Sequence, residues 1–135
     1  MDTTTLKPYL KKDVAFTISG QRLEFAVSQT LFSSHQVDIG SAHLLKTLPF
    51  DRIRDNARIL DLGCGYGPLG LTLAWLKPTA EVHMVDRDAL AVDFTLLNAH
   101  RLGVSNAVAY GSLGYNDVRS RTFDLIISNI PGKAG

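Results

Sequence analysis

Residues Ala57 to Gly70 read ARILDLGCGYGPLG, and the architecture of the chain follows from them. The apolar run ARILDL predicts a short strand, the glycines predict a loop, and LGLTLAWLK predicts a helix that ends before Pro78. Pro68 suits the first helical turn, where its missing N–H costs nothing. Glycines let a ligand approach the backbone closely, and the helical N-terminus presents amides to an anion or a carboxylate. This stretch therefore predicts a site for a nucleotide-like ligand.

Downstream of this unit, strands and helices alternate. The segments AEVHMVD, NAVAY and FDLIISN predict strands, and RDALAVDFTLLNAHRLG predicts a helix capped by Asp88 and ended by Gly103. Such alternation indicates βαβ units and a parallel sheet. Right-handed crossovers then predict helices on both faces of the sheet.

Upstream, two segments alternate with period two around Gly20, which predicts a β-hairpin. The stretch LFSSHQVDIGS (31–41) predicts a loop, after which Ser41 caps a helix that runs to Pro49. We expect one domain: a flexible N-terminus over 1–12, a hairpin plus helix over 13–56 and a cofactor-binding core over 57–135.

Composition places the chain among ordinary globular domains. Its 135 residues are 45% hydrophobic and 20% charged, with a net charge of +1, which excludes a strongly basic nucleic-acid-binding tail but not a local basic patch. A single cysteine, Cys64, cannot form an internal disulfide, so a reducing cytoplasm is the expected location. The N-terminus lacks an apolar signal sequence, and no window has the roughly 20 apolar residues of a membrane helix.

Two ligands are compatible with the glycine loop. Gly65 to Gly70 match the dinucleotide pattern G-x-G-x-x-G, and Asp86 follows about 20 residues later, which supports NAD. Against NAD, Asp61 would repel a pyrophosphate but could take a cationic amine, and the glycine run begins earlier, at Gly63. A connection without any ligand is the weaker alternative, because three glycines cost chain entropy. Asp86 can accept hydrogen bonds from two ribose hydroxyls. Its alternative role, the helix cap, suits Asp88 better.

The segments ILDLGCGYGPLGLTLA, VDRDALAV and FDLIISNIP together resemble the S-adenosylmethionine-dependent methyltransferases of the Rossmann-like class. With LFSSHQVDIGSAHLLKTL upstream, residues from about 25 to 135 resemble the small methyltransferase domain family, which includes ribosomal RNA guanine-N2 methyltransferases. The resemblance implies an α/β fold with a doubly wound, mostly parallel sheet, preceded by the hairpin. The usual seven-stranded sheet has three further strands after this point, so we expect a C-terminally truncated domain.

The resemblance also implies roles for the residues of the loop and the strand ends. Asp61, Gly63 and Gly65 would hold the methionine end of S-adenosylmethionine, and Asp86 would bind its ribose. Arg87 would lie beside the adenine and Ser112 against its amino group. Cys64 has no base placed to make it a nucleophile, so it is expected to contact the ligand as a small residue. The predicted cofactor-binding residues are Asp61, Gly63, Cys64, Gly65, Tyr66, Asp86, Arg87 and Ser112.

The motif at Asn129 resembles the Asn-Pro-Pro-aromatic site of amino-methylating relatives, whose Asn side chain and first proline carbonyl orient the target nitrogen. Here the motif is Asn129-Ile130-Pro131-Gly132, so Ile130 still offers a carbonyl, but the aromatic platform, whose stacking on a base is worth roughly 1–3 kcal/mol, is missing. Asn129, Ile130 and Pro131 are the predicted catalytic residues. As an alternative, Asn129 is only a turn residue. Substitute platforms are Tyr66, Phe32 and His35, and Lys133 could touch phosphate.

If the usual strand order holds, the strands that end near Asp61 and Asn129 are neighbours, and both residues face one crevice. The strand around FDLIIS would then be an exposed sheet edge, through which the chain could form a homodimer. The four histidines lack the spacing of metal ligands, so we expect no metal.

We therefore expect an S-adenosylmethionine-dependent N-methyltransferase that acts on an exocyclic guanine amine of ribosomal RNA by direct displacement. Two alternatives stay open: methylation of a protein glutamine amide, and a non-catalytic remnant that binds cofactor or RNA. No membrane partner is expected.

Overall fold

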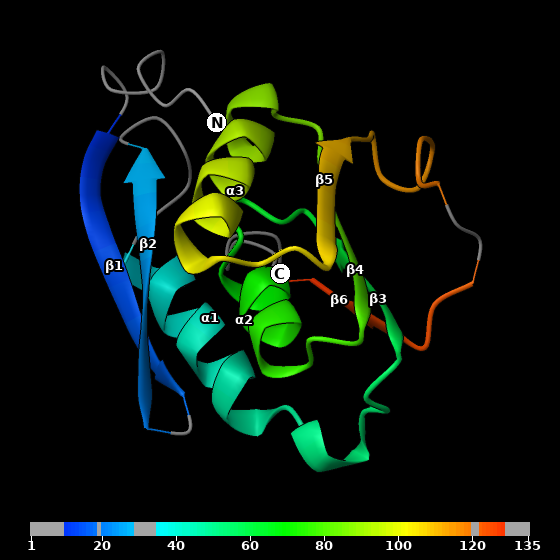
Figure 1. Ribbon diagram of the computed structural model, residues 1–135. Coiled ribbons are helices and arrows are strands. Elements are labelled where there is room, and N and C mark those ends of the chain that lie inside the picture. The colour runs from blue at the N-terminus through cyan, green and yellow to red at the C-terminus, as the bar shows by residue number, and fades with distance from the viewer. Residues whose placement is uncertain (1–9, 19, 29–34, 120–121, 129–135) are drawn as a thin grey trace.

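The computed structural model describes residues 10–18, 20–28, 35–119 and 122–128 (Figure 1). In the part of the chain that the structure describes, no helix has the length and hydrophobicity of a membrane span. The elements follow in the order β1 (Leu10–Ile18), β2 (Gln21–Ser28), α1 (His35–Thr47), the 3₁₀ turn η2 (Phe50–Arg52), β3 (Arg58–Leu62), α2 (Pro68–Leu76), β4 (Glu81–Asp86), α3 (Ala89–Leu102), β5 (Ala107–Gly111) and β6 (Leu125–Ile127).

Strands β3 to β6 form one parallel sheet with the order β5-β4-β3-β6. This confirms the predicted α/β fold and the prediction that the strand ending near Asp61 neighbours the strand that precedes Asn129. In the register of β3 and β6, Asp61 pairs with Ile127. The start of β6 is fixed by Asp124, whose carboxylate accepts the Arg58 backbone N–H at 2.8 Å.

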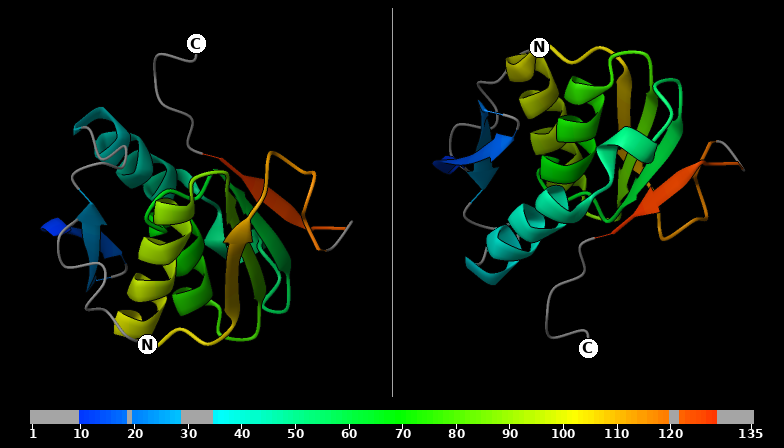
Figure 2. Two further views of the ribbon diagram at one scale, coloured as in Figure 1. Left: turned by 90° about the horizontal axis from the view of Figure 1, so that it is seen from above. Right: turned by 90° about the horizontal axis from the view of Figure 1, so that it is seen from below.

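Helices α2 and α3 pack on one face of this sheet (Figure 2). The prediction of helices on both faces is therefore wrong for the described residues. Both crossovers, from β3 to β4 and from β4 to β5, step in the same direction, and right-handed connections then place both helices on the same side. The opposite face carries Leu60, Val85 and Tyr110, and Val118 and Phe123 of the connection to β6 pack against them.

The predicted hairpin is confirmed, and it forms an outer layer over the helices (Figure 1). Phe25 is fully buried and lies edge-on to Phe16 and to Tyr66, with ring centroids 5.8 and 6.0 Å apart. At the rim, Arg101 of α3 pairs with Asp13 of β1 at 3.2 Å. Strand β1 begins at Leu10, within the segment 1–12 for which we expected a flexible N-terminus.

Helix α1 begins earlier than the sequence predicts. Its first residue is His35, so the stretch from 35 to 41 is helical rather than a loop, and Ser41 lies inside the helix instead of capping it. Gly40 lowers the helix propensity of this segment, because glycine inside a helix costs about 1 kcal/mol relative to alanine. The sequence pattern therefore indicates a loop instead of a helix. Packing compensates for that cost, since Ser41 and Leu45 are each only 1% exposed.

Candidate functional site

The glycine loop, residues 63–67, leaves β3 at the carboxyl edge of the sheet and folds over the end of β4. The backbone amides of Gly63 and Cys64 both donate to the Val85 carbonyl at 2.9 Å. Gly67 is the N-cap residue before helix α2 and has a φ of 98°, and a Cβ there would come within 2.8 Å of Leu71 and 3.2 Å of Thr95. Only glycine fits this position without strain.

Asp61 lies at the end of β3, behind the loop, with 1% of its surface exposed. Its Oδ2 accepts the backbone N–H of Gly70 at 3.0 Å. Gly67, at the N-cap of α2, provides no side-chain cap, so the carboxylate of Asp61 caps the helix from the neighbouring strand. Gly70 must be glycine for this approach, because a Cβ there would lie 2.6 Å from the Met84 side chain.

The environment of Asp61 favours its neutral form or a cationic neighbour. Burial raises the pKa of Asp61 to about 7, and the negative charge of Asp86 adds to the rise, while the hydrogen bond from Gly70 opposes it. A positive group placed beside this carboxylate would stabilise its ionised form. A cation rather than a pyrophosphate stays the prediction for this position.

Asp86 ends β4 and connects the loop to helix α3. Its Oδ2 accepts the Gly65 amide at 3.0 Å, and its Oδ1 accepts the Asp88 amide at 2.9 Å. Each carboxylate oxygen keeps a second lone pair, so two hydroxyl groups could still bind. Asp88 is the N-cap of α3, as predicted, because its side chain accepts the Leu90 amide at 2.9 Å.

Cys64 and Tyr66 turn their side chains away from solvent. Cys64 is 4% exposed, its Sγ lies 3.5 Å from Thr95 Oγ1, and burial together with the charge of Asp61 raises the pKa of its thiol. A neutral buried thiol is no nucleophile. Tyr66 is 1% exposed and packs against Phe25, so its ring leaves no face on which a ligand could stack.

Ser112 and Arg87 lie beyond the ends of β5 and β4. The Ser112 hydroxyl donates to the Gly114 carbonyl at 2.5 Å and accepts the Asp117 amide at 3.1 Å, so it already serves its own loop. Its backbone amide donates to the Asp86 carbonyl at 3.0 Å, which keeps it at the predicted edge. Arg87 is exposed at the same edge.

The predicted catalytic residues Asn129, Ile130 and Pro131 lie outside the described residues, as do Phe32, Lys133 and the side chain of His35. The residue just before this motif is placed beside the cofactor half of the site, since Ser128 Oγ donates to the Leu62 carbonyl at 2.8 Å.

Sequence reasoning missed two polar residues of α3 that hold the loop. Thr95 Oγ1 donates to the Gly65 carbonyl at 2.8 Å, and Asn98 Nδ2 donates to the Tyr66 carbonyl at 2.8 Å. Both are fully buried. Their signal is that they interrupt the apolar face formed by Phe94 and Leu97, where a polar side chain needs a hydrogen-bond partner.

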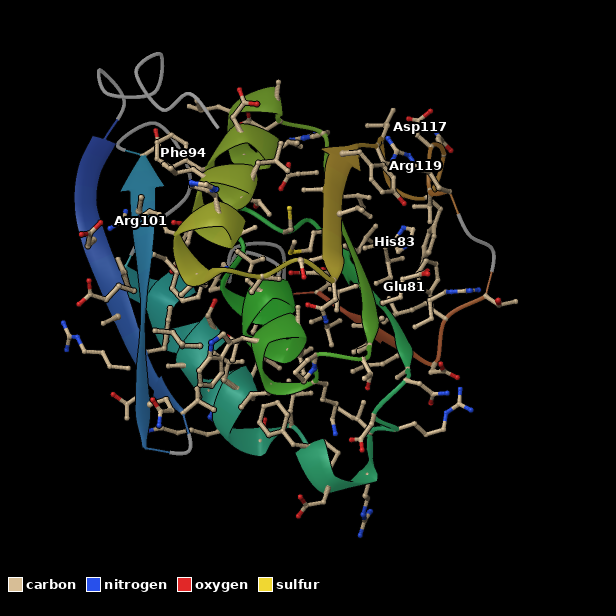
Figure 3. All side chains as sticks on the ribbon, viewed as in Figure 1. Glu81, His83, Phe94, Arg101, Asp117 and Arg119 are labelled. Atoms are coloured by element: carbon tan, nitrogen blue, oxygen red, sulfur yellow. The ribbon has the colours of Figure 1, made fainter. Side chains whose placement is uncertain are left out.

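A second polar cluster lies on the opposite face of the sheet (Figure 3). His83 Nδ1 is 2.7 Å from the Tyr110 hydroxyl, and its Nε2 is 3.0 Å from Glu81. The Tyr110 hydroxyl also accepts the Arg119 amide at 3.0 Å. Both ring nitrogens of His83 are therefore engaged, and the contact with Tyr110 connects β4 to β5. Within the described part of the chain, no three His, Cys, Asp or Glu side chains form a candidate metal site.

Comparison with known proteins bears on the function of this site. Residues 22–135 match the family described as the methyltransferase small domain. The chain is 35% identical over 126 residues to the uncharacterized protein YbxB of Bacillus subtilis, covering 93% of this chain and 62% of that protein. It is also 39% identical over 106 residues to ribosomal RNA small subunit methyltransferase C of Mannheimia succiniciproducens, covering 75% and 29%. Among solved structures, TYW2 of M. jannaschii in complex with AdoMet superposes with a TM-score of 0.64 at 14% identity, covering 86% and 50%.

We predict that Asp61 makes the protein less stable as pH rises from about 4 to 7. In this window the unfolded chain, with an ordinary pKa of 3.8, has lost the proton that the folded protein still binds with a pKa of about 7. The free energy of unfolding therefore falls with rising pH, by at most about 1.4 kcal/mol per pH unit, and levels off above pH 7.

Urea denaturation of the wild type and of Asp61→Asn at pH 5, 6, 7 and 8 would measure this effect. The difference between the two proteins isolates Asp61 from the histidines that they share. Glu81 and Asp124 do not interfere, since their pKa values are lowered from 4.5 and 3.8 and they titrate below this range. Parallel pH profiles for the two proteins would contradict the assignment.

Proposed function

Because the chain belongs to the methyltransferase small domain family, we propose that it forms the cofactor-binding part of an S-adenosylmethionine-dependent N-methyltransferase. The proposed acceptor is an exocyclic guanine amine of ribosomal RNA. The observation that carries this proposal is the buried Asp61 carboxylate behind a glycine loop that Asp86 also holds.

The chain spans less than two thirds of the relatives that it matches, 62% of the Bacillus subtilis protein and 29% of the Mannheimia enzyme. The activity proposed here is therefore that of the whole enzyme to which such a domain contributes.

The residues of the loop suit S-adenosylmethionine better than NAD. Asp61 would bind the ammonium group of the methionine end, because a cation relieves the cost of ionising a buried carboxylate. Asp86 would accept the two ribose hydroxyls, and Gly63 and Gly65 would let the ligand approach the backbone. Arg87 and Ser112 would lie towards the adenine. When bound, the cofactor supplies an electrophilic methyl group.

The residues after β6 would hold the acceptor. The Asn129 side chain and the Ile130 carbonyl, with Pro131 next in the motif, would accept hydrogen bonds from the target amine and so aim its lone pair at the methyl group. This contribution is mainly positional. It is supported by the pairing of β3 with β6, which brings Ser128 beside the end of β3.

RNA is the proposed partner because a relative that is 39% identical is named as a ribosomal RNA methyltransferase. The cytoplasm is the proposed location, in keeping with a single, buried cysteine.

Cofactor binding tests the first half of this proposal. Isothermal titration should show binding of S-adenosylmethionine and none of NAD. The Asp86→Ala variant should bind at least about ten-fold more weakly, a loss of 1.4 kcal/mol, because it removes both the loop anchor and the ribose acceptor. Asp88→Asn is the matched control: it removes a carboxylate two residues away and keeps a good cap. Binding of NAD alone would refute the cofactor, and unchanged affinity in Asp86→Ala would refute its role.

Methyl transfer tests the second half. In the full enzyme, Asn129→Ala should leave the affinity for S-adenosylmethionine unchanged and lower the transfer rate by about 100-fold, since the amine loses its orientation. Labelled cofactor, ribosomal RNA and nucleoside analysis would measure the rate and identify the base. Asn116→Ala, on an exposed loop, is the control. Full activity in Asn129→Ala would contradict its role, and label on protein glutamine without label on RNA would favour the alternative substrate.

The edge of the sheet is a proposed contact for a second copy of the chain. Strand β6 has three residues, and its central residue, Ile126, is 47% exposed. Unpaired strand edges tend to pair with other chains. Sedimentation velocity should show a concentration-dependent dimer that Ile126→Lys abolishes. The matched change Val108→Lys, at a 40% exposed position on the opposite edge strand β5, should leave it intact. A monomer at all concentrations would dismiss this contact.

A further inference from the structure

Asn98 joins three segments that are distant in sequence. Its side chain, fully buried on α3, accepts the Ala26 amide at 2.7 Å and donates to the Ala26 carbonyl at 3.0 Å and to the Tyr66 carbonyl at 2.8 Å. Both N–H groups and the oxygen of the carboxamide are therefore engaged. One side chain thus connects the hairpin, helix α3 and the glycine loop.

On the hairpin side, the Asn98 side chain bonds the backbone of β2 as a neighbouring strand would. Ala26 is completely buried in β2, and its backbone N–H and C=O both bond to the Asn98 carboxamide. If the buried N–H and C=O groups of Ala26 had no hydrogen-bond partners, the folded state would be destabilised. The Asn98 carboxamide therefore satisfies both backbone groups of Ala26 where the hairpin docks on α3.

On the loop side, Asn98 acts together with Thr95, which lies three residues earlier on the same helix face. Thr95 holds the carbonyl of Gly65 and Asn98 holds that of Tyr66, two consecutive acceptors of the loop. With both oxygens turned onto α3, neither can point at a ligand carboxylate and repel it. The conformation of the loop thus depends on these two side chains.

We propose that Asn98 is a positioning residue for the cofactor, which transmits the docking of the N-terminal hairpin to the glycine loop. It touches no ligand itself and acts through the carbonyl of Tyr66. This inference rests on the proposed function, because it concerns the affinity of the same loop for S-adenosylmethionine.

Asn106 provides a matched control. Its Nδ2 donates to the carbonyls of Ala74, Lys77 and Ala80 at 3.1, 3.0 and 2.9 Å, so it also closes three backbone contacts with one carboxamide. It does so at the far end of α2, away from the loop. Asn98→Ala and Asn106→Ala should both lower the melting temperature, but only the first should disturb the cofactor site.

The experiment is isothermal titration with S-adenosylmethionine at a temperature where circular dichroism shows both variants folded. Asn98→Ala should bind about ten-fold more weakly than the wild type, and Asn106→Ala should bind as the wild type does. Equal affinity in Asn98→Ala, or an equal loss in both variants, would overturn the inference. If the wild type does not bind S-adenosylmethionine at all, the proposed function fails instead.

A second measurement needs no variant. Amide hydrogen exchange of the wild type should slow at Ala26 when S-adenosylmethionine is added, beyond any slowing at Ala80, whose amide donates to Lys77 next to the control site. Ala26 is in the hairpin, so its protection would report coupling through Asn98. Equal protection of the two amides would show global stabilisation alone and would overturn the coupling.

Discussion

The hydrogen bond from the Gly70 amide to the buried Asp61 carboxylate is the interaction on which the site depends. It requires that helix α2 approach the sheet so closely that position 70 carries no side chain, since a Cβ would overlap Met84. The same approach aligns the first turn of α2 behind the glycine loop. A carboxylate from one strand thereby caps a helix whose own N-cap, Gly67, cannot do so.

The loop itself is held from the other side by α3 and by the end of β4. The Asp86 carboxylate accepts a hydrogen bond from the Gly65 amide, and the Thr95 hydroxyl donates one to the Gly65 carbonyl. The Asn98 carboxamide donates to the carbonyl of Tyr66. A glycine-rich segment has high conformational entropy when free, so these contacts preorganise it for a ligand. A substitution at Asp86 would therefore alter the loop as well as the ribose contact proposed for it.

Local signals in the sequence were sufficient for the core of the fold. The run from Ala57 to Gly70 combines an apolar strand, glycines and a first-turn proline, and each of these is specific for one local structure. Helix α1 was misjudged because Gly40 lowers local propensity, whereas the burial of Leu45, which no local pattern reports, compensates. Asn98 was missed for a related reason. The backbone groups that it bonds belong to Ala26 and Tyr66, 72 and 32 residues away, and only the folded chain with its docked hairpin brings them together.

The burial of Asp61 bears on the charge of the ligand proposed for this site. An anionic pyrophosphate beside this carboxylate would raise its pKa further and keep it protonated, so part of the binding energy would be lost to proton uptake. An ammonium group has the opposite effect, because it stabilises the ionised carboxylate and releases the proton that burial retains near neutral pH. The hydrogen bond from Gly70 offsets part of the cost of this buried carboxylate in the free protein, and a bound cation would offset more of it. The dinucleotide-like spacing of the glycines and the proposed cationic ligand are therefore compatible, because the glycines would set how closely the ligand approaches the backbone and Asp61 would favour a positive charge.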